Sequence, residues 1–151
     1  MNKQKQSHRY TKLEDDGLWR QASEVALWCY SQLHNFNEDE AYGMQPRLRD
    51  RSFDLTNDIA EAAGSIDPRD KAYYFGQALR DCFGIRNTLI MANKTGMLDV
   101  EPAVLVQLDK LAKALNDEVA DQTDDIPEYL RQFDVHDRHD AHEHGDHRHE
   151  G

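Results

Sequence analysis

The stretch Phe36-Asn-Glu-Asp-Glu-Ala-Tyr-Gly-Met44, followed by Leu48 and by Asn57-Asp-Ile-Ala-Glu-Ala62, decides the fold of this chain. It joins two amphipathic segments through a short acidic turn, which Gly43 and Pro46 interrupt. Pro46 suits the first position of a helix, because the N–H that proline lacks would have no acceptor there. The stretch therefore predicts two helices joined by a brief connection.

Apolar residues recur at intervals near 3.6 over four segments, at about residues 16–36, 46–64, 68–96 and 99–122. Asp67 and Pro68 predict the start of the third helix. Gly64 predicts a left-handed end for the second helix, and Gly96 predicts the end of the third. No run alternates apolar and polar residues over the length of a strand. Because the connections are short, consecutive helices are expected to be antiparallel neighbours. We therefore predict an all-α chain that forms an up-down-up-down four-helix bundle.

The bundle is expected to occupy residues 16–122, after a flexible N-terminus at 1–15. Residues 123–133 are expected to form a short segment docked on the bundle. Residues 134–151 are almost entirely His, Asp, Glu, Arg and Gly, so they have little to bury. We predict a disordered acidic and His-rich tail there.

The net charge of −11 is concentrated in the last third of the chain. Residues 46–96 hold 8 basic and 7 acidic side chains, whereas residues 97–133 hold 3 and 9, and residues 134–151 hold 2 and 6. The middle of the chain is therefore the part whose net charge is positive and favours binding of an anionic partner.

The sequence predicts a cytoplasmic protein without membrane contact. No apolar run approaches the ~18 residues that span a bilayer. The N-terminus has no apolar stretch behind its basic residues, unlike a secretory signal. Cys29 and Cys82 both fall on apolar helix faces. We expect them to be reduced core thiols.

Several motifs, in their order and spacing over about residues 17–120, resemble the ribosomal-RNA intervening-sequence family of four-helix-bundle proteins. They are Trp19-x-x-Ala22-x-x-Val25-Ala26 with Tyr30, Glu40-x-Tyr42-Gly43-Met44, Leu48-Arg49, Ile59-Ala60-Glu61, Phe75, Leu89, Ala92 and Gly96-Met97-Leu98. The chain departs from the family pattern at Ala62, at Asp81-Cys82 and at Ile85, where the family has glycine, a small Gly-Ser pair and glutamate.

The resemblance implies a homo-oligomer, typically a pentameric barrel. A related branch is the accessory variability determinant of diversity-generating retroelements, which works beside a reverse transcriptase and RNA. That branch is basic, whereas this chain is acidic.

The sequence does not contain the components of a recognisable active site. Outside the tail the histidines are His8 and His34, and no serine or cysteine is paired with a base at a persuasive spacing. Inward Glu-x-x-His pairs, Gly-rich phosphate loops and paired Cys-x-x-Cys motifs are absent. We predict that the protein is not an enzyme and has no cofactor.

Basic residues of the middle helices are the candidates for contact with RNA. They are Arg47, Arg49, Arg51, Arg69, Lys71, Arg80 and Arg86. Phosphate neutralisation dominates RNA affinity, which favours such a group. The alternative is that interleaved aspartates neutralise them in local pairs.

The tail is the candidate for weak binding of a divalent transition metal through imidazole. Its histidines are His136, His139, His142, His144, His147 and His149. The alternative is a solvated polar tail, because a metal would have to order a flexible segment at a cost in entropy.

Apolar residues beside the core stripes are the candidates for a subunit interface. They are Trp28, Phe53, Phe83, Ile90 and Met97. The alternative is a broad core face, which ordinary globular helices also have.

Two hypotheses follow. The first is a non-catalytic, homo-oligomeric scaffold or accessory subunit, with RNA or a reverse transcriptase as further partners. The second is a metal-binding protein that acts through its His-rich tail.

Overall fold

The computed structural model describes residues 10–37 and 43–131, and the regular structure of these residues is entirely helical, with no β-strand. The four long helices are α2 (Gly17–Gln32), α3 (Met44–Gly64), α4 (Pro68–Lys94) and α5 (Pro102–Asp124). The short elements are the 3₁₀ turns η1 (Leu13–Asp15) and η2 (Leu33–Asn35) and the single turn α6 (Glu128–Arg131). The prediction of an all-α chain with four long helices is confirmed.

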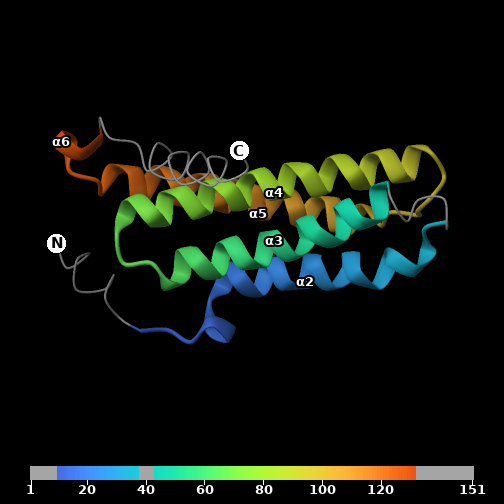
Figure 1. Ribbon diagram of the computed structural model, residues 1–151, viewed down its shortest axis with the longest axis horizontal. Helices are drawn as coiled ribbons and strands as arrows, with labels where there is room; N and C mark the ends of the chain where they lie inside the picture. The colour runs from blue at the N-terminus through green and yellow to red at the C-terminus, as the bar shows by residue number, and fades with distance from the viewer. Residues whose placement is uncertain (1–9, 38–42, 132–151) are drawn as a thin grey trace, which may run out of the picture.

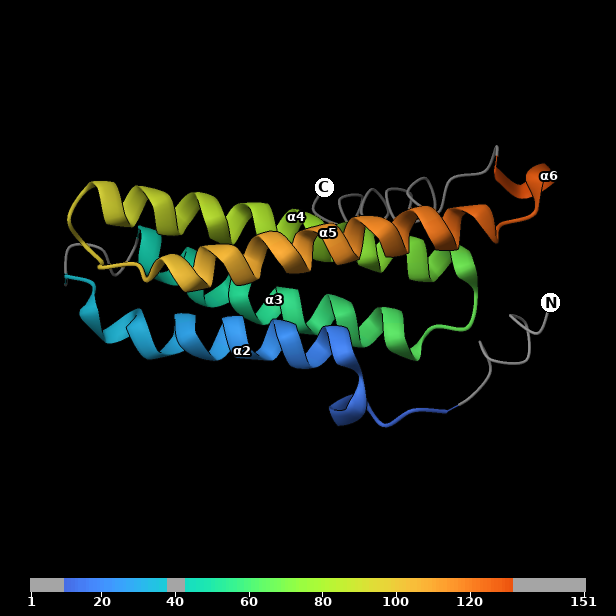
Figure 2. The same cartoon turned by 180° about the vertical axis from the view of Figure 1, so that it is seen from behind.

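The four long helices lie lengthwise along one another, and consecutive helices run in opposite directions (Figures 1 and 2). The most extensive contacts are those of α4 with α3 and with α5. Helix α2 packs on α3 and, less extensively, on α5. Among the described residues, no helix has the length and apolar character needed to cross a membrane.

The core lies between the four long helices and is built from the stripes that the sequence predicts. Its fully buried members are mostly leucine, isoleucine, valine, alanine and cysteine, among them Val25, Cys29, Leu48, Leu55, Ile59, Ile85, Leu89, Leu108, Leu111 and Leu115. They recur at three- and four-residue intervals, so each helix presents one apolar stripe inward.

Polar caps begin two of the long helices. The side chain of Asp16 accepts a hydrogen bond from the amide of Trp19 at 2.9 Å, at the start of α2. Asp67 accepts one from the amide of Arg69 at 2.9 Å, with Pro68 as the first residue of α4. Each cap satisfies a backbone N–H that has no acceptor within its helix. The predicted start of α4 is confirmed.

Two other helix starts differ from the predicted ones because of where their prolines lie. Helix α3 begins at Met44, so Pro46 is its third residue rather than its first. Proline fits there because none of the first four amides has an acceptor within the helix. Helix α5 begins at Pro102 rather than near Asp99, since proline disfavours helical backbone in the preceding residue.

Helix ends also differ from expectation at two places. Gly64 is the last residue of α3, but its backbone is not left-handed. Ser65 closes the helix instead. Its backbone amide donates to the carbonyl of Ala62, and its hydroxyl donates to the carbonyl of Glu61. Helix α2 stops at Gln32, and the 3₁₀ turn η2 carries the chain on to the buried Phe36.

Gly96 follows the end of α4 at Lys94 by two residues and has a left-handed backbone, with a φ of 77°. An added Cβ is disfavoured there, so Gly96→Ala should lower the free energy of unfolding by about 1 kcal/mol. Gly76, inside α4, has open space around the position of a Cβ. Gly76→Ala should therefore raise stability by about 0.5–1 kcal/mol. Urea unfolding of both variants measures the two changes, and the same sign for both would contradict the assignment of strain to Gly96.

Candidate functional site

The predicted interface residues fall into two groups. Phe53 on α3 and Phe83 on α4 are 58% and 66% exposed. Ile90 lies seven residues after Phe83 on the same face of α4 and is half-buried. Trp28 and Met97 pack partly against the core. Met97 lies beyond the end of α4, so it does not continue the repeat of Phe83 and Ile90 on the helix face.

Each of the four long helices exposes a large apolar side chain. Besides Phe53 and Phe83, these include Leu27 on α2 and Val106 on α5, which are 67% and 53% exposed. The side-chain amide of Gln45 (Nε2) donates a hydrogen bond to the backbone carbonyl of Leu33 at 3.1 Å. This contact fixes how the end of α2 lies against the start of α3. Phe53 then lies about 12 Å along α3 from this contact and Leu27 about 9 Å along α2. These two side chains therefore stand at nearly the same height on neighbouring helices.

Most of the predicted RNA-binding residues make contacts within the chain. The closest are Arg51 Nη1 to Asp81 Oδ1 at 3.0 Å, Arg69 Nη2 to Asp67 Oδ2 at 2.8 Å, Lys71 Nζ to the Ala62 carbonyl at 2.9 Å, Arg86 Nη1 to the Leu105 carbonyl at 3.0 Å, and Arg49 Nε to Asp50 Oδ1 at 3.3 Å. Arg47 and Arg80 are exposed and make no hydrogen bond or ion pair with another described residue. The seven side chains are spread over two helices and do not form one positive surface.

The most unusual polar group is Asp81, which is 3% exposed on α4. Its Oδ1 accepts the hydrogen bond from Arg51 of α3. Its Oδ2 is buried and receives no hydrogen bond from an amide, a hydroxyl or a basic group of the described residues. A buried oxygen without a partner is costly, so a further proton donor is expected here.

Asp58 of α3 is the acid beside Asp81. Burial, a hydrogen bond with Asp81 and the nearby carboxylates of Asp81, Asp54 and Glu61 raise the pKa of Asp58 from 3.8 to about 8. The protonated form of Asp58 is therefore favoured, and in that form its carboxyl group can donate a hydrogen bond to Asp81.

Gly84 makes room for the arginine in this cluster. A Cβ at Gly84 would lie 2.7 Å from Nε and 3.1 Å from Cζ of Arg51. The guanidinium group therefore crosses α4 directly over the glycine backbone, one helical turn after Asp81. We refer to Arg51, Asp58, Asp81 and Gly84 as the α3–α4 polar cluster.

Both cysteines are free and buried. Burial raises the pKa of the Cys29 thiol to about 11 and that of the Cys82 thiol to about 12. Both thiols are therefore protonated at neutral pH and poorly nucleophilic.

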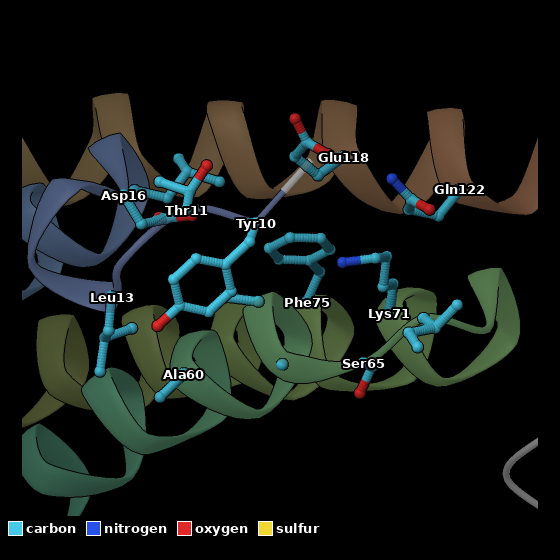
Figure 3. A pocket seen from close by; sticks show the side chains of 14 residues that line it. Tyr10, Thr11, Leu13, Asp16, Ala60, Ser65, Lys71, Phe75, Glu118 and Gln122 are labelled. Carbon is cyan, nitrogen blue, oxygen red and sulfur yellow. The ribbon is translucent and has the colours of Figure 1, made fainter. Parts of the chain in front are cut away.

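A pocket of about 650 Å³ lies at the end of the helices where the chain passes from α3 to α4. Its apolar lining includes Leu13, Leu18, Ile66 and Phe75. Figure 3 shows the ring of Tyr10 beside that of Phe75, with Lys71 on α4 next to them. Glu118 and Gln122 reach the pocket from α5, and Asp16 from the start of α2 (Figure 3).

Lys71 is the basic group of this pocket. Its ammonium donates to the carbonyl of Ala62 near the end of α3. Burial lowers the pKa of Lys71, while the carboxylates of Asp16 and Glu118 act in the opposite direction. Two carboxylates therefore lie near one ammonium group, so one negative charge has no positive group to balance it.

The six predicted metal-binding histidines, at positions 136–149, lie outside the described residues. Within residues 10–37 and 43–131, no group of three or more His, Cys, Asp or Glu side chains is placed to hold a metal ion.

The α3–α4 polar cluster and the pocket were not predicted from the sequence. One signal for the cluster was available, because Asp81 directly precedes the core residue Cys82 and follows Ala78 by three positions. A charged residue on the edge of an apolar stripe requires a partner when the helix is buried. The pocket had no such signal, since its lining comes from four separate segments.

Comparison with known proteins adds no relative. No protein-family model matches the chain, and a search of curated proteins finds no match. The resemblance to the intervening-sequence family stays a prediction.

The raised pKa of Asp58 makes stability depend on pH. The folded chain holds the proton of Asp58 up to about pH 8, whereas the unfolded chain releases it near pH 3.8. The folded state binds more protons in this interval, so stability decreases as pH rises from about 4 to about 8. In Asp58→Asn this decrease should be smaller, and the variant should melt at a higher temperature than the unaltered protein at about pH 8.

Thermal melting followed by circular dichroism over this pH range measures the effect. The matched control is Asp121→Asn, which removes an exposed carboxylate of α5 and should keep the original pH profile. If Asp58→Asn and Asp121→Asn give the same profile, Asp58 does not hold the proton.

Proposed function

We propose that this chain is a non-catalytic four-helix-bundle scaffold or accessory subunit that assembles with copies of itself. The observation that carries the proposal is the exposure of large apolar side chains on the outer faces of the long helices. Phe53 and Phe83 are each more than half exposed near the middle of their helices. Exposed apolar groups that gather into one patch mark a protein–protein contact.

The geometry supports an interface made of helix faces. On α4, Phe83 and Ile90 lie seven residues apart, about two helical turns, and so present one apolar row. On α2 and α3, Leu27 and Phe53 stand at nearly the same height. A second copy that packs on such rows would bury them without any change in the core.

The resemblance to the intervening-sequence family supports the same proposal and favours five copies. RNA or a reverse transcriptase as a further partner rests on that resemblance. Of the seven predicted basic residues, Arg47 and Arg80 are the exposed ones available to such a partner, because Arg49, Arg51, Arg69, Lys71 and Arg86 make contacts within the described part of the chain.

Size exclusion with light scattering tests the assembly, and we expect a mass five times that of the 17.5 kDa chain. Phe83→Glu should shift the protein to monomers, because a buried, unpaired charge at an interface costs several kcal/mol. Its helical content should stay unchanged, since the side chain is already exposed in the single chain.

Gln21→Glu is the matched control. It adds the same charge at an exposed position on α2, a helix that does not pack extensively on α4. This variant should keep the mass of the unaltered protein. A monomeric mass for the unaltered protein at ~10 µM, a concentration at which a stable homo-oligomer stays assembled, would overturn the proposal.

A further inference from the structure

The pocket at the α3-to-α4 end has the size of a small-molecule site. Its volume of about 650 Å³ lies within the range of ligand pockets. Its wall is about equally apolar and polar, and its charged side chains are Asp16, Lys71 and Glu118. Apolar side chains can hold the body of a small molecule, and the charged groups can orient it.

The charges of the pocket favour a cation. Lys71 compensates one of the two carboxylates, which leaves one negative charge. Asp16 also caps α2, whereas Glu118 makes no hydrogen bond or ion pair with another described residue. Glu118 is half-buried on α5, so its carboxylate is the group that lacks a compensating partner.

The aromatic side chains add a second preference. Phe75 lies at the base of the pocket, and the exposed Tyr10 stands beside it at the mouth (Figure 3). Aromatic faces attract organic cations, and they also cover apolar groups.

We propose that this pocket binds a small organic cation, an amine or quaternary ammonium compound with an apolar or aromatic body. The body lies on Phe75, Tyr10 and the aliphatic wall, and the cationic group pairs with Glu118. Lys71 keeps its hydrogen bond to the carbonyl of Ala62, and its positive charge balances the carboxylate of Asp16. This binding is proposed independently of assembly: Leu27, Phe53, Phe83 and Val106 do not line the pocket, whose own exposed apolar side chains are Tyr10 and Ile66.

The test uses the full chain and benzyltrimethylammonium chloride as the probe, with 3-phenylpropionate and benzyl alcohol as anionic and neutral comparisons. Isothermal titration calorimetry should give a dissociation constant of about 1 mM or lower for the cation, as expected for a ligand of this size. The anion and the alcohol should bind at least about tenfold more weakly, as an uncompensated carboxylate in a partly desolvated site implies.

Two variants locate the site. Glu118→Gln keeps the shape of the side chain and should weaken binding of the cation by about fivefold or more. Its control, Asp117→Asn, removes the same charge from the adjacent, exposed position and should change binding by less than about twofold. Tyr10→Ala, at an exposed position outside the core, should weaken binding by about threefold.

Circular dichroism of each variant separates loss of binding from loss of fold. The proposal is overturned if the cation fails to bind at concentrations up to about 10 mM, which is well above the dissociation constant expected for this pocket. Equal binding of the three probes overturns it too, as does an equal effect of the Glu118 and Asp117 variants.

Discussion

The pairing of α3 with α4 depends on how the buried carboxylate of Asp81 is satisfied. A carboxyl group that is 3% exposed is costly to bury unless it is paired. Arg51 supplies a positive charge and a hydrogen bond to one oxygen, and Asp58 lies beside the group with a raised pKa that favours its protonated form. Both come from α3, so a shift of one helix along the other would break two contacts of the same carboxylate. Such a group contributes more to the choice of register than to net stability, because apolar residues would fill the space at lower cost.

This constraint also explains one feature of the helix surfaces. The guanidinium group of Arg51 reaches Asp81 over a position where any Cβ would collide with it, and Gly84 occupies that position. Glycine inside a helix costs about 0.5–1 kcal/mol relative to alanine. At Gly84 it leaves the space through which Arg51 passes, whereas Gly76 in the same helix has no such neighbour. The chain therefore accepts a residue of low helix propensity at position 84 and gains the contact of Arg51 with Asp81, which lies 30 positions away in the sequence.

The sequence was sufficient for the helices and their inward faces, because these depend on short-range periodicity. Leu48, Leu55 and Ile59 lie on one stripe in the sequence and are fully buried in the structure. Helix ends were less predictable, since a cap depends on which side chain reaches the last free carbonyls. At the end of α3 this is Ser65 and not Gly64. The basic residues show the same limit more strongly. From the sequence alone, Arg51 and Arg86 are expected to be exposed charges. The packing of α4 on its neighbours shows that Arg51 donates to Asp81 and Arg86 donates to the carbonyl of Leu105.

The two proposed binding regions are arranged so that neither needs the other. The apolar groups Leu27, Phe53, Phe83 and Val106 are exposed along the long helices, whereas the pocket lies at the end where α3 passes into α4. Coupling between two sites requires that one ligand changes the free energy of the other's bound state. None of these four apolar residues lines the pocket, so a ligand bound there does not contact them.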